Sequence, residues 1–561
     1  MTAASPPAQG VIIAADFCPD CGKAAVVRLG NGGPSGRFLC DKALGGCGKE
    51  IKVQNRGALD PREVDRVLEL ARDAQVFRDA ETGEPHITFS EGQRETTAPL
   101  GSGAVKAWLR RICKQAHGRT AASEAINGAV ESLAADALVG PEVPVFRRIG
   151  RAPDGSVVID LCDDTGAVVV VNAEGWTIED RPPVRFYRGQ SMSAMPRPEV
   201  GGSLSDLRGF INVATDRDLH LCIIWTLAAT WPEGPWPIGL FVGPPGSGKS
   251  WAAEVLRDLV DPNKKPRRKL PNDPRDVGAA ARNVRVLSYE NLSGISPKVA
   301  DLFCQLATGA ASETRALFTN ADEHVVNLNQ PVLLNGIDPP TQRGDFIERA
   351  IQVHLARIPD ASRTTERELR RQWTAAKPKI FGALCDAIAA AIRNLPNVTL
   401  ASHPRMADLA ELIVAAEPAI GVPPGTLLAD YLAAVEDAEV EALGDDPIAR
   451  LVDDLVGPAD GAEWRGSAAE LLDALKARFQ ARDAADAESA AKDAKSAAKP
   501  AAWPRDAPQS AVAMGSWLAR NTALLTGWRI EVERGMKGRD RSKRKEWTLR
   551  RLSTDPPKVP E

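Results

Sequence analysis

A phosphate-loop pattern near the middle of the chain constrains the fold more than any other feature. The run GPPGSGKS, Gly243 to Ser250, fits G-x-x-x-x-G-K-[ST] without a mismatch. An apolar, strand-like run, PIGLFV, precedes it, and a helix-like run, WAAEVLRDLV, follows it. This order of strand, glycine-rich loop and helix predicts that backbone N–H groups and a helix N-terminus bind the phosphates of a nucleotide.

Each residue type in this run has a physical purpose. Glycines let the backbone approach phosphate oxygens, Lys249 reaches the β- and γ-phosphates, and Ser250 offers a hydroxyl to Mg²⁺. We therefore expect ATP and Mg²⁺ as cofactors. The expected nucleotide-binding residues are Gly243, Pro244, Pro245, Gly246, Ser247, Gly248, Lys249 and Ser250. The alternative is a glycine-rich turn that contains a lysine by chance.

A second strand is expected to supply the acid that such a loop needs. Glu290 follows the apolar run Val284–Leu287, and we expect it to hold Mg²⁺ together with Ser250 as the Walker B acid. The alternative is a glutamate that faces solvent at a strand end. Asn291 follows in place of a second acid, and an amide cannot accept a proton from water, so the general base is not identified.

The pattern along the rest of the chain predicts a multidomain α/β protein. Apolar strand-like runs alternate with helical patterns over residues 206–400, which predicts a parallel sheet covered by helices. A length of 561 residues predicts several domains. We expect a zinc ribbon at 14–55, a mixed α+β domain of unknown role at 60–205, a P-loop ATPase core at 206–400, a helical lid at 401–455, and a winged-helix-like domain at 456–555 with a flexible insert at 481–502.

Four cysteines near the N-terminus have the spacing of a zinc site. Cys18 and Cys21 form one pair, and Cys40 and Cys47 form a second, wider pair. Four thiolates in two knuckles predict a tetrahedral, structural Zn²⁺ site, with unbound thiols as the alternative. Lysines and arginines surround these cysteines, and the pattern does not separate nucleic-acid binding from protein docking.

Two basic runs stand out from the net charge of −4. The C-terminal order of helix, linker, helix, strand, basic loop and strand predicts a winged helix whose loop KGRDRSKRK contacts DNA phosphates. Its expected DNA-binding residues are Lys537, Arg539, Arg541, Lys543, Arg544 and Lys545. The Ala-rich tract before it is either a solvated helix or a flexible linker. The run KKPRRK at 264–269 faces DNA, a neighbouring subunit or solvent.

Composition excludes several classes of protein. Hydrophobic residues make up 43% and charged residues 26%, which excludes a fully disordered chain, and the net charge of −4 excludes a polycation. The longest uncharged apolar run, Leu221–Trp231, is about half the length that spans a bilayer, so we expect no membrane association. The N-terminus lacks the pattern of a signal peptide, and the scattered cysteines suit a reducing compartment, so we expect a cytoplasmic protein.

A resemblance to a known family rests on the run LATGAASETRALFTNADEHVVNLNQPVLLNGI, residues 306–337. It resembles the segment between Walker B and motif C of superfamily 3 helicases and related phage primase–helicase ATPases, which belong to the AAA+ type. The matching positions are Thr308, Gly309, Arg315, Leu317 and Asn335. The spacing from the P-loop through ENLSG to LLNGI resembles ATP-binding proteins of actinobacterial phages and integrated mobile elements over about 206–440. That subgroup has aspartate where this chain has Glu290.

The resemblance implies further roles. Asn335 is implied as sensor 1, and Arg349 as an arginine finger that enters the neighbouring subunit's site, with Arg343 as the rival candidate. Arg405 is implied as a sensor 2-like contact. A hairpin between Arg315 and Asn335 is implied to contact DNA, with His324 at or near its tip.

The expected function is that of an ATP-dependent DNA helicase or translocase, similar to primase–helicases, in the replication of a phage or mobile element. The expected partners are single-stranded or forked DNA and a primase or another replication protein. The resemblance also implies further copies of the chain in a ring of six subunits. Two alternatives stay open. One is a regulatory or loading ATPase that uses ATP as an assembly switch, and the other is a nucleic-acid-sensing ATPase in mobile-element conflict.

Overall fold

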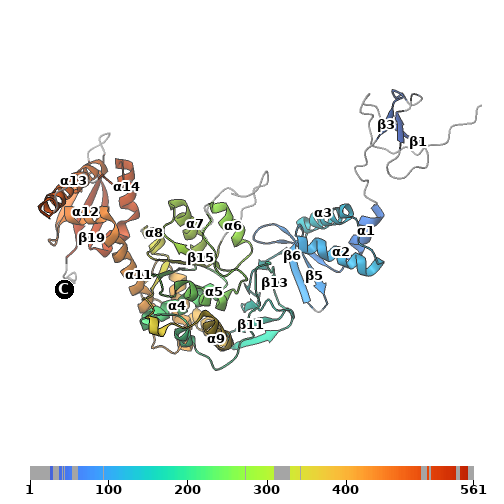
Figure 1. Ribbon diagram of the computed structural model, residues 1–561, viewed down its shortest axis with the longest axis horizontal. Helices are drawn as coiled ribbons and strands as arrows, with labels where there is room; N and C mark the ends of the chain where they lie inside the picture. The colour runs from blue at the N-terminus through green and yellow to red at the C-terminus, as the bar shows by residue number, and fades with distance from the viewer. Residues whose placement is uncertain are drawn as a thin grey trace, which may run out of the picture. The chain divides into compact units, whose positions relative to one another are not determined.

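The computed structural model describes residues 26–29, 37–40, 42, 45–52, 61–92, 94–271, 273–308, 329–341, 343–493, 502–504, 507–537 and 544–553. The chain is a mixed α/β protein with several sheets (Figure 1). It divides into two compact units. One comprises Met1–Arg78, Glu84–Phe89 and Ala98–Glu142, and the other comprises Asp79–Gly83, Ser90–Thr97 and Val143–Glu561.

The first unit contains a small antiparallel sheet of order β1-β2-β3 and a set of three helices with further strands. Phe89 stacks on Trp108 with ring centroids 4.3 Å apart, and both side chains are buried with Leu109 and Ile126 in one apolar core. The elements are β1 (Val26–Leu29), β2 (Arg37–Cys40), β3 (Glu50–Lys52), α1 (Pro61–Leu70), β4 (Gln75–Asp79), β5 (Pro85–Glu91), β6 (Arg94–Pro99), α2 (Gly103–His117), α3 (Ser123–Val139) and β7 (Glu142–Val143).

The second unit contains a β-meander. Four antiparallel strands have the order β12-β11-β10-β9, and β13 pairs in parallel with β8. Val157 and Val169 lie in the largest apolar core of the molecule, whereas Val158 and Val170 lie in a second cluster, so both faces of this sheet are covered. The elements are β8 (Val145–Phe146), β9 (Ile149–Arg151), β10 (Val157–Asp160), β11 (Val168–Asn172), β12 (Gly175–Glu179) and β13 (Arg185–Phe186).

A buried ion pair joins the segment before β9 to the end of α5 (Lys249–Val260), the helix that follows the glycine-rich loop. Arg148 and Asp261 have fully buried side chains, and Arg148 Nε lies 3.1 Å from Asp261 Oδ1. Arg148 also donates to the backbone carbonyls of Asp160 and Ser193. The sequence groups residues 143–205 with 60–142, but in the structure these residues share a unit and a core with the P-loop region.

A parallel sheet of order β15-β16-β14-β17 forms the centre of the second unit. Its two faces carry separate apolar cores, because alternate residues such as Phe241 and Leu240 point to opposite sides. The elements are α4 (Asp216–Thr230), β14 (Ile238–Val242), α5 (Lys249–Val260), α6 (Pro274–Ala281), β15 (Leu287–Leu292), α7 (Pro297–Thr308), β16 (Val332–Gly336), α8 (Gly344–Ile347) and β17 (Ala350–His354). The alternating pattern over 206–400 therefore predicted the sheet and its parallel strands correctly.

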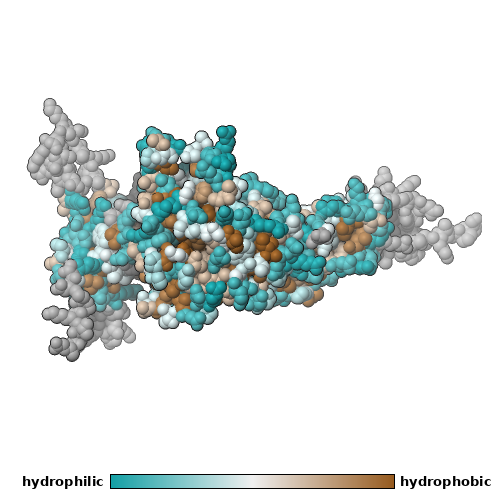
Figure 2. All heavy atoms as spheres, turned by 90° about the horizontal axis from the view of Figure 1, so that it is seen from below, coloured by the Kyte–Doolittle hydropathy of each residue, from teal (hydrophilic) through white to brown (hydrophobic). Residues whose placement is uncertain are grey.

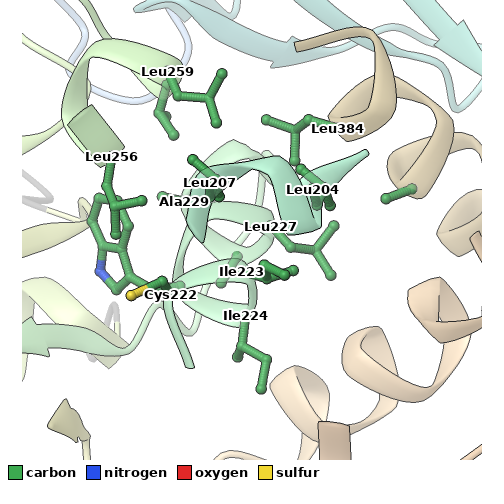
Figure 3. Packing of buried hydrophobic residues seen from close by; sticks show 14 of the residues in the cluster. Leu204, Leu207, Cys222, Ile223, Ile224, Leu227, Ala229, Leu256, Leu259 and Leu384 are labelled. Atoms are coloured by element: carbon green, nitrogen blue, oxygen red, sulfur yellow. The ribbon is translucent and has the colours of Figure 1, made fainter. Parts of the chain in front are cut away.

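The core on one face of this sheet is centred on α4, which is apolar on nearly all sides. Figure 3 shows side chains of α4, such as Ile223 and Leu227, close to Leu256 and Leu259 of α5, Leu384 of α9, and Leu204 and Leu207. Thr215 begins α4 with a capping box, in which its hydroxyl accepts from the backbone of Asp218. Burial of this helix fixes α5, and with it the loop before α5.

The region expected to form a lid, 401–455, contains α10 (Ala407–Ile420) and α11 (Thr426–Asp445), and the long helix α9 (Glu366–Asn394) precedes it. α9 packs along α10, and α11 packs on α4. His220 Nδ1 of α4 lies 2.6 Å from Asp430 Oδ2 of α11, and Arg217 of α4 pairs with Asp437 of α11 at 2.8 Å. These polar contacts fix α11 to the core.

The C-terminal region has its own apolar core and a three-stranded antiparallel sheet of order β18-β20-β19. The elements are α12 (Pro447–Val456), β18 (Glu463–Gly466), α13 (Ala468–Asp493), α14 (Ala511–Arg520), α15 (Thr522–Gly527), β19 (Ile530–Lys537) and β20 (Arg544–Arg551). The expected flexible insert at 481–502 is helical over 481–493, where it continues α13. Alanine, glutamate, lysine and arginine are good helix formers, which is the physical reason.

None of the described helices is both long enough and apolar enough to cross a lipid bilayer. The face of the molecule in Figure 2 is mainly hydrophilic, and its hydrophobic residues appear in small groups. Isolated apolar residues of this kind are ordinary at protein surfaces.

Candidate functional site

The glycine-rich loop connects β14 to α5, as the sequence predicts. Gly246 and Gly248 adopt φ values of 79° and 87°, a left-handed conformation that side chains disfavour. A Cβ added at Gly243 would meet the carbonyl oxygen of Leu355 at 2.2 Å. Glycine is therefore required at these points to form a tight loop whose N–H groups precede α5.

Lys249 is the first residue of α5 and folds back over the loop. Its Nζ donates to the carbonyl oxygens of Gly243 at 2.6 Å and Pro244 at 2.8 Å. Burial lowers the pKa of Lys249 from its ordinary value. Ser250, the next residue, is half-buried in the first turn of the same helix. The amine and the hydroxyl thus lie at one end of α5, beside the loop.

Two residues outside any motif support the loop. Asn212 Nδ2 donates to the carbonyl oxygen of Ser247 at 3.1 Å and to that of Ala356 at 2.7 Å. A Cβ added at Gly246 would lie 3.2 Å from Arg363 Nη2, so this guanidinium lies directly against the loop. The sequence analysis missed both residues, because a single asparagine or arginine carries no spacing signal.

The expected acid and sensor lie on the two strands beyond β14. Asn335 of β16 is buried, and its Oδ1 accepts a hydrogen bond of 2.9 Å from the backbone N–H of Asn291. Asn291 has φ 59°, and the pairing of β15 with β16 is irregular there. The Glu290 side chain is half-buried, and Glu290 itself lies in the irregular part of the pairing, between Tyr289 and Leu292.

β16 joins these residues to the glycine-rich loop. It lies between β14 and β15, with Phe241 opposite Asn335 in the register of β14 and β16. The backbone N–H of Gly243 donates to the carbonyl oxygen of Ile337 at 3.0 Å. Because the strands are parallel, their carboxyl ends lie at the same edge of the sheet. Lys249, Glu290 and Asn335 all lie at this edge or directly after it. A lysine, a carboxylate and an amide at this edge can bind phosphates, a divalent cation and water.

The candidate arginines lie around the short helix α8. Arg343 Nη2 pairs with Asp301 and with Asp345, each at 2.6 Å. Arg349 Nη1 donates to the carbonyl oxygen of Asp345 at 2.5 Å, and its buried Nε has no hydrogen-bond partner among the described residues. Arg405 lies 3.5 Å from Glu348. The roles of these arginines stay predictions.

Part of the expected DNA-binding set lies outside the described residues. His324, Arg539, Arg541 and Lys543 belong to that part, as do Gly309, Arg315 and Leu317 of the family resemblance. Lys537 and Arg544 face each other in the register of β19 and β20, next to the pair Met536 and Lys545. The basic residues that are described therefore lie where these two strands meet the basic loop.

The four candidate zinc ligands are also only partly described. Cys18 and Cys21 lie outside the described residues. The backbone N–H of Cys47 donates to Cys40 Sγ at 3.2 Å, so the second pair is close in space. Within the described part of the chain, no group of three metal-binding side chains is present.

Comparison with known proteins gives one sequence match. Residues 204–441, less than half of the chain, match the family model of the actinomycete integrative conjugative element replication protein. No curated protein sequence matches the chain. The matched residues cover α4, the P-loop and the helices up to α11. This region is therefore related in sequence to replication proteins of mobile elements.

Comparison with solved structures gives distant similarities. An apo structure of the NrS-1 C-terminal region has 12% identity and a TM-score of 0.35, and it covers 87% of this chain and 98% of that chain. A JCV helicase has 10% identity and a TM-score of 0.18, and it covers 39% of this chain and 66% of that chain. At these TM-scores, the similarities do not establish a shared fold.

Proposed function

We propose that the protein is an ATP-hydrolysing DNA helicase or translocase that acts in the replication of a mobile element. The observation that carries the proposal is the convergence of Lys249, Glu290 and Asn335 at one sheet edge, with β16 hydrogen-bonded to both neighbouring segments. The family match over 204–441 supports the place in mobile-element replication. ATPase activity follows from the site, whereas translocation follows from the family resemblance.

The residues fit a nucleotide with Mg²⁺. The positive-φ glycines and the N-terminus of α5 form a cradle for phosphate oxygens, and Lys249 is ready to exchange its bonds to loop carbonyls for bonds to phosphate. Ser250 and Glu290 provide the oxygen ligands that Mg²⁺ prefers. When bound, ATP·Mg²⁺ supplies the phosphoryl group and the charge that polarises it.

The chain's own groups then orient water. Asn335 is positioned by its bond to Asn291 and offers an amide to a water near the terminal phosphate. The trans arginine is proposed to be Arg349, which implies that the active form is a ring in which each site is completed by a neighbour. Such an arginine stabilises charge on the transferring phosphoryl group.

The C-terminal region supports a proposed contact with DNA. Its order is helix, strand, three helices and a strand pair, with α12 and β18 as the first helix and strand, and this order supports the proposed winged helix. We propose that the basic loop between β19 and β20 binds DNA phosphates. A Zn²⁺ ion held by Cys18, Cys21, Cys40 and Cys47 is proposed as a structural element of the N-terminal region.

A second function is favoured by one observation. Asn291 stands where a second acid often follows the Walker B acid, and its N–H is engaged by Asn335. Without a carboxylate there, hydrolysis is expected to be slow. A slow ATPase suits an assembly switch that loads or regulates other proteins on DNA and does not unwind it.

ATP-dependent strand displacement on a forked DNA separates the two functions. Wild type is compared with Lys249→Ala, which removes the phosphate-binding amine but not the proposed DNA contacts. Unwinding by wild type alone supports the helicase. If neither protein unwinds the fork, although both bind DNA and wild type changes its oligomeric size with ATP, the helicase is rejected in favour of the switch.

A further inference from the structure

The run KKPRRK at 264–269 follows α5 and belongs to no helix or strand; it is called the basic strap below. Five of its six residues are cationic. The side chains of Lys264, Lys265 and Lys269 are exposed, and no described carboxylate pairs with them. Lys264 Nζ donates to the carbonyl oxygen of Gln190 at 2.9 Å, so Lys265 and Lys269 are the more available cations. Pro266 of the strap is half-buried, so the strap presents charge to solvent and no large apolar side chain.

The strap is held in a defined path by its backbone. Arg257 of α5, which is 1% exposed, donates through Nη1 to the carbonyl oxygens of Lys265 at 3.0 Å and Pro266 at 2.9 Å. The backbone N–H of Lys265 donates to Asn263 Oδ1 at 3.0 Å. Arg267 Nε donates to Glu254 Oε2 of α5 at 2.9 Å. The lysines therefore project from a fixed backbone, which lowers the entropy cost of binding a partner.

The strap also contacts the strand that carries the Walker B acid. The backbone N–H of Glu290 donates to the carbonyl oxygen of Arg268 at 2.9 Å. β15 is the edge strand of the central sheet, so Arg268 supplies an acceptor that a further strand would otherwise supply. The strap thus touches α5, which begins at Lys249, and the backbone of Glu290.

We propose that the basic strap binds the sugar-phosphate backbone of DNA, and that DNA bound there accelerates ATP hydrolysis through Glu290. The proposal rests on the proposed function and assigns a DNA contact to a different segment from the C-terminal loop. A row of phosphates matches several fixed lysines. A protein partner is disfavoured because the strap lacks the aromatic and aliphatic anchors that protein interfaces use.

The test compares two double variants. Lys265→Ala/Lys269→Ala removes two strap charges, and Lys114→Ala/Lys379→Ala removes two exposed lysines from helices α2 and α9. ATP hydrolysis is measured against the concentration of single-stranded DNA at several salt concentrations. Circular dichroism and hydrolysis without DNA report whether each protein is folded.

We expect hydrolysis without DNA to be unchanged in both variants. In the strap variant, the DNA concentration for half-maximal stimulation should rise about five- to tenfold, and the salt dependence should become shallower by about 1 to 2 in log–log slope. At saturating DNA, the DNA-stimulated rate of ATP hydrolysis should stay at least about twofold below that of wild type, because DNA no longer acts on Glu290 through the strap. The control variant should behave like wild type.

Three results contradict the proposal in distinguishable ways. A strap variant identical to wild type shows that the strap is only a solvated loop. A full stimulated rate at saturating DNA shows that the strap holds DNA without acting on Glu290. The third result is that wild type and control hydrolyse ATP, do not bind DNA, and do not change their rate when DNA is added. This result rejects the proposed DNA function and, with it, the strap proposal.

Discussion

Asn335 uses its two polar groups differently. Its Oδ1 accepts from the backbone of Asn291, whereas no described residue accepts a hydrogen bond from its Nδ2. An amide N–H that no protein group engages can donate to a water or to a phosphate oxygen. We infer that the acceptor fixes the loop after Glu290 and that the donor is kept for a water or phosphate oxygen.

Substitution of Asn335 separates these two tasks. Asn335→Asp keeps an acceptor for Asn291 but removes the donor and adds negative charge, whereas Asn335→Ala removes both groups. We expect both variants to lose about 10²-fold in the steady-state rate of ATP hydrolysis, because the donor acts on charge that develops in the reaction. Nucleotide affinity, measured with a fluorescent ATP analogue, should change little in Asn335→Ala. A wild-type rate in Asn335→Asp would show that the residue only positions Asn291.

The sequence predicts single residues well only where spacing identifies them. Gly243 to Ser250 could be named because strand, glycines, lysine and helix occur in a fixed order, and the structure places them as that order requires. Asn212 and Arg363 could not be named, although both lie against the same loop. Their position depends on how distant segments fold back, which one sequence does not reveal.

At the scale of elements, the sequence predicts which helices and strands form better than it predicts which of them lie side by side. The strands and helices around the P-loop follow from alternating apolar runs, but the insertion of β16 between β14 and β15 does not, because it depends on crossover connections. The meander of β9–β12 is a second example. Its two buried faces, which place it in the second unit, depend on helices far along the chain such as α9.

The C-terminal region shows the same limit and leads to a prediction. Its apolar core joins α12, most of which the sequence analysis placed in the helical lid, and β18, which it did not predict, to α13, α14 and β20. Because this core is separate from the cores of the central sheet, we expect a fragment of residues 440–561 to fold alone. It should bind DNA with a log–log salt slope of about −3 to −5, which measures the number of phosphates contacted.

A variant of the same fragment that lacks three basic side chains serves as the test of its basic loop. Lys543→Ala/Arg544→Ala/Lys545→Ala should weaken DNA binding at least about tenfold at low salt, because it removes charges that attract DNA phosphates, and it should leave the thermal unfolding midpoint unchanged. Fluorescence anisotropy with labelled DNA and a thermal melt give the two quantities. A folded fragment that does not bind DNA would assign the contact elsewhere in the chain.

At the scale of the whole molecule, the arginines around α8 decide between a self-sufficient site and one completed by a neighbour. Arg343 is engaged by two carboxylates, which hold it in place. Within the described part of the chain, the Arg349 side chain makes one hydrogen bond, to a carbonyl oxygen, and its buried Nε has no partner. Moving this side chain therefore breaks fewer interactions than moving Arg343. Arg349 is therefore the better candidate for insertion into an adjacent subunit.

Mixing two inactive variants tests this directly. Lys249→Ala destroys the site in its own subunit but still supplies Arg349, whereas Arg349→Ala keeps its own Lys249 and lacks the arginine. If the sites are shared between subunits, an equal mixture should recover about a quarter of the wild-type ATPase rate, because about one random interface in four then combines both intact residues. Lys249→Ala mixed with itself at the same total concentration gives the baseline. Recovery absent from the mixture, although both variants assemble to the wild-type size, would mean that Arg349 acts within its own subunit, and the ring would then be unnecessary for hydrolysis.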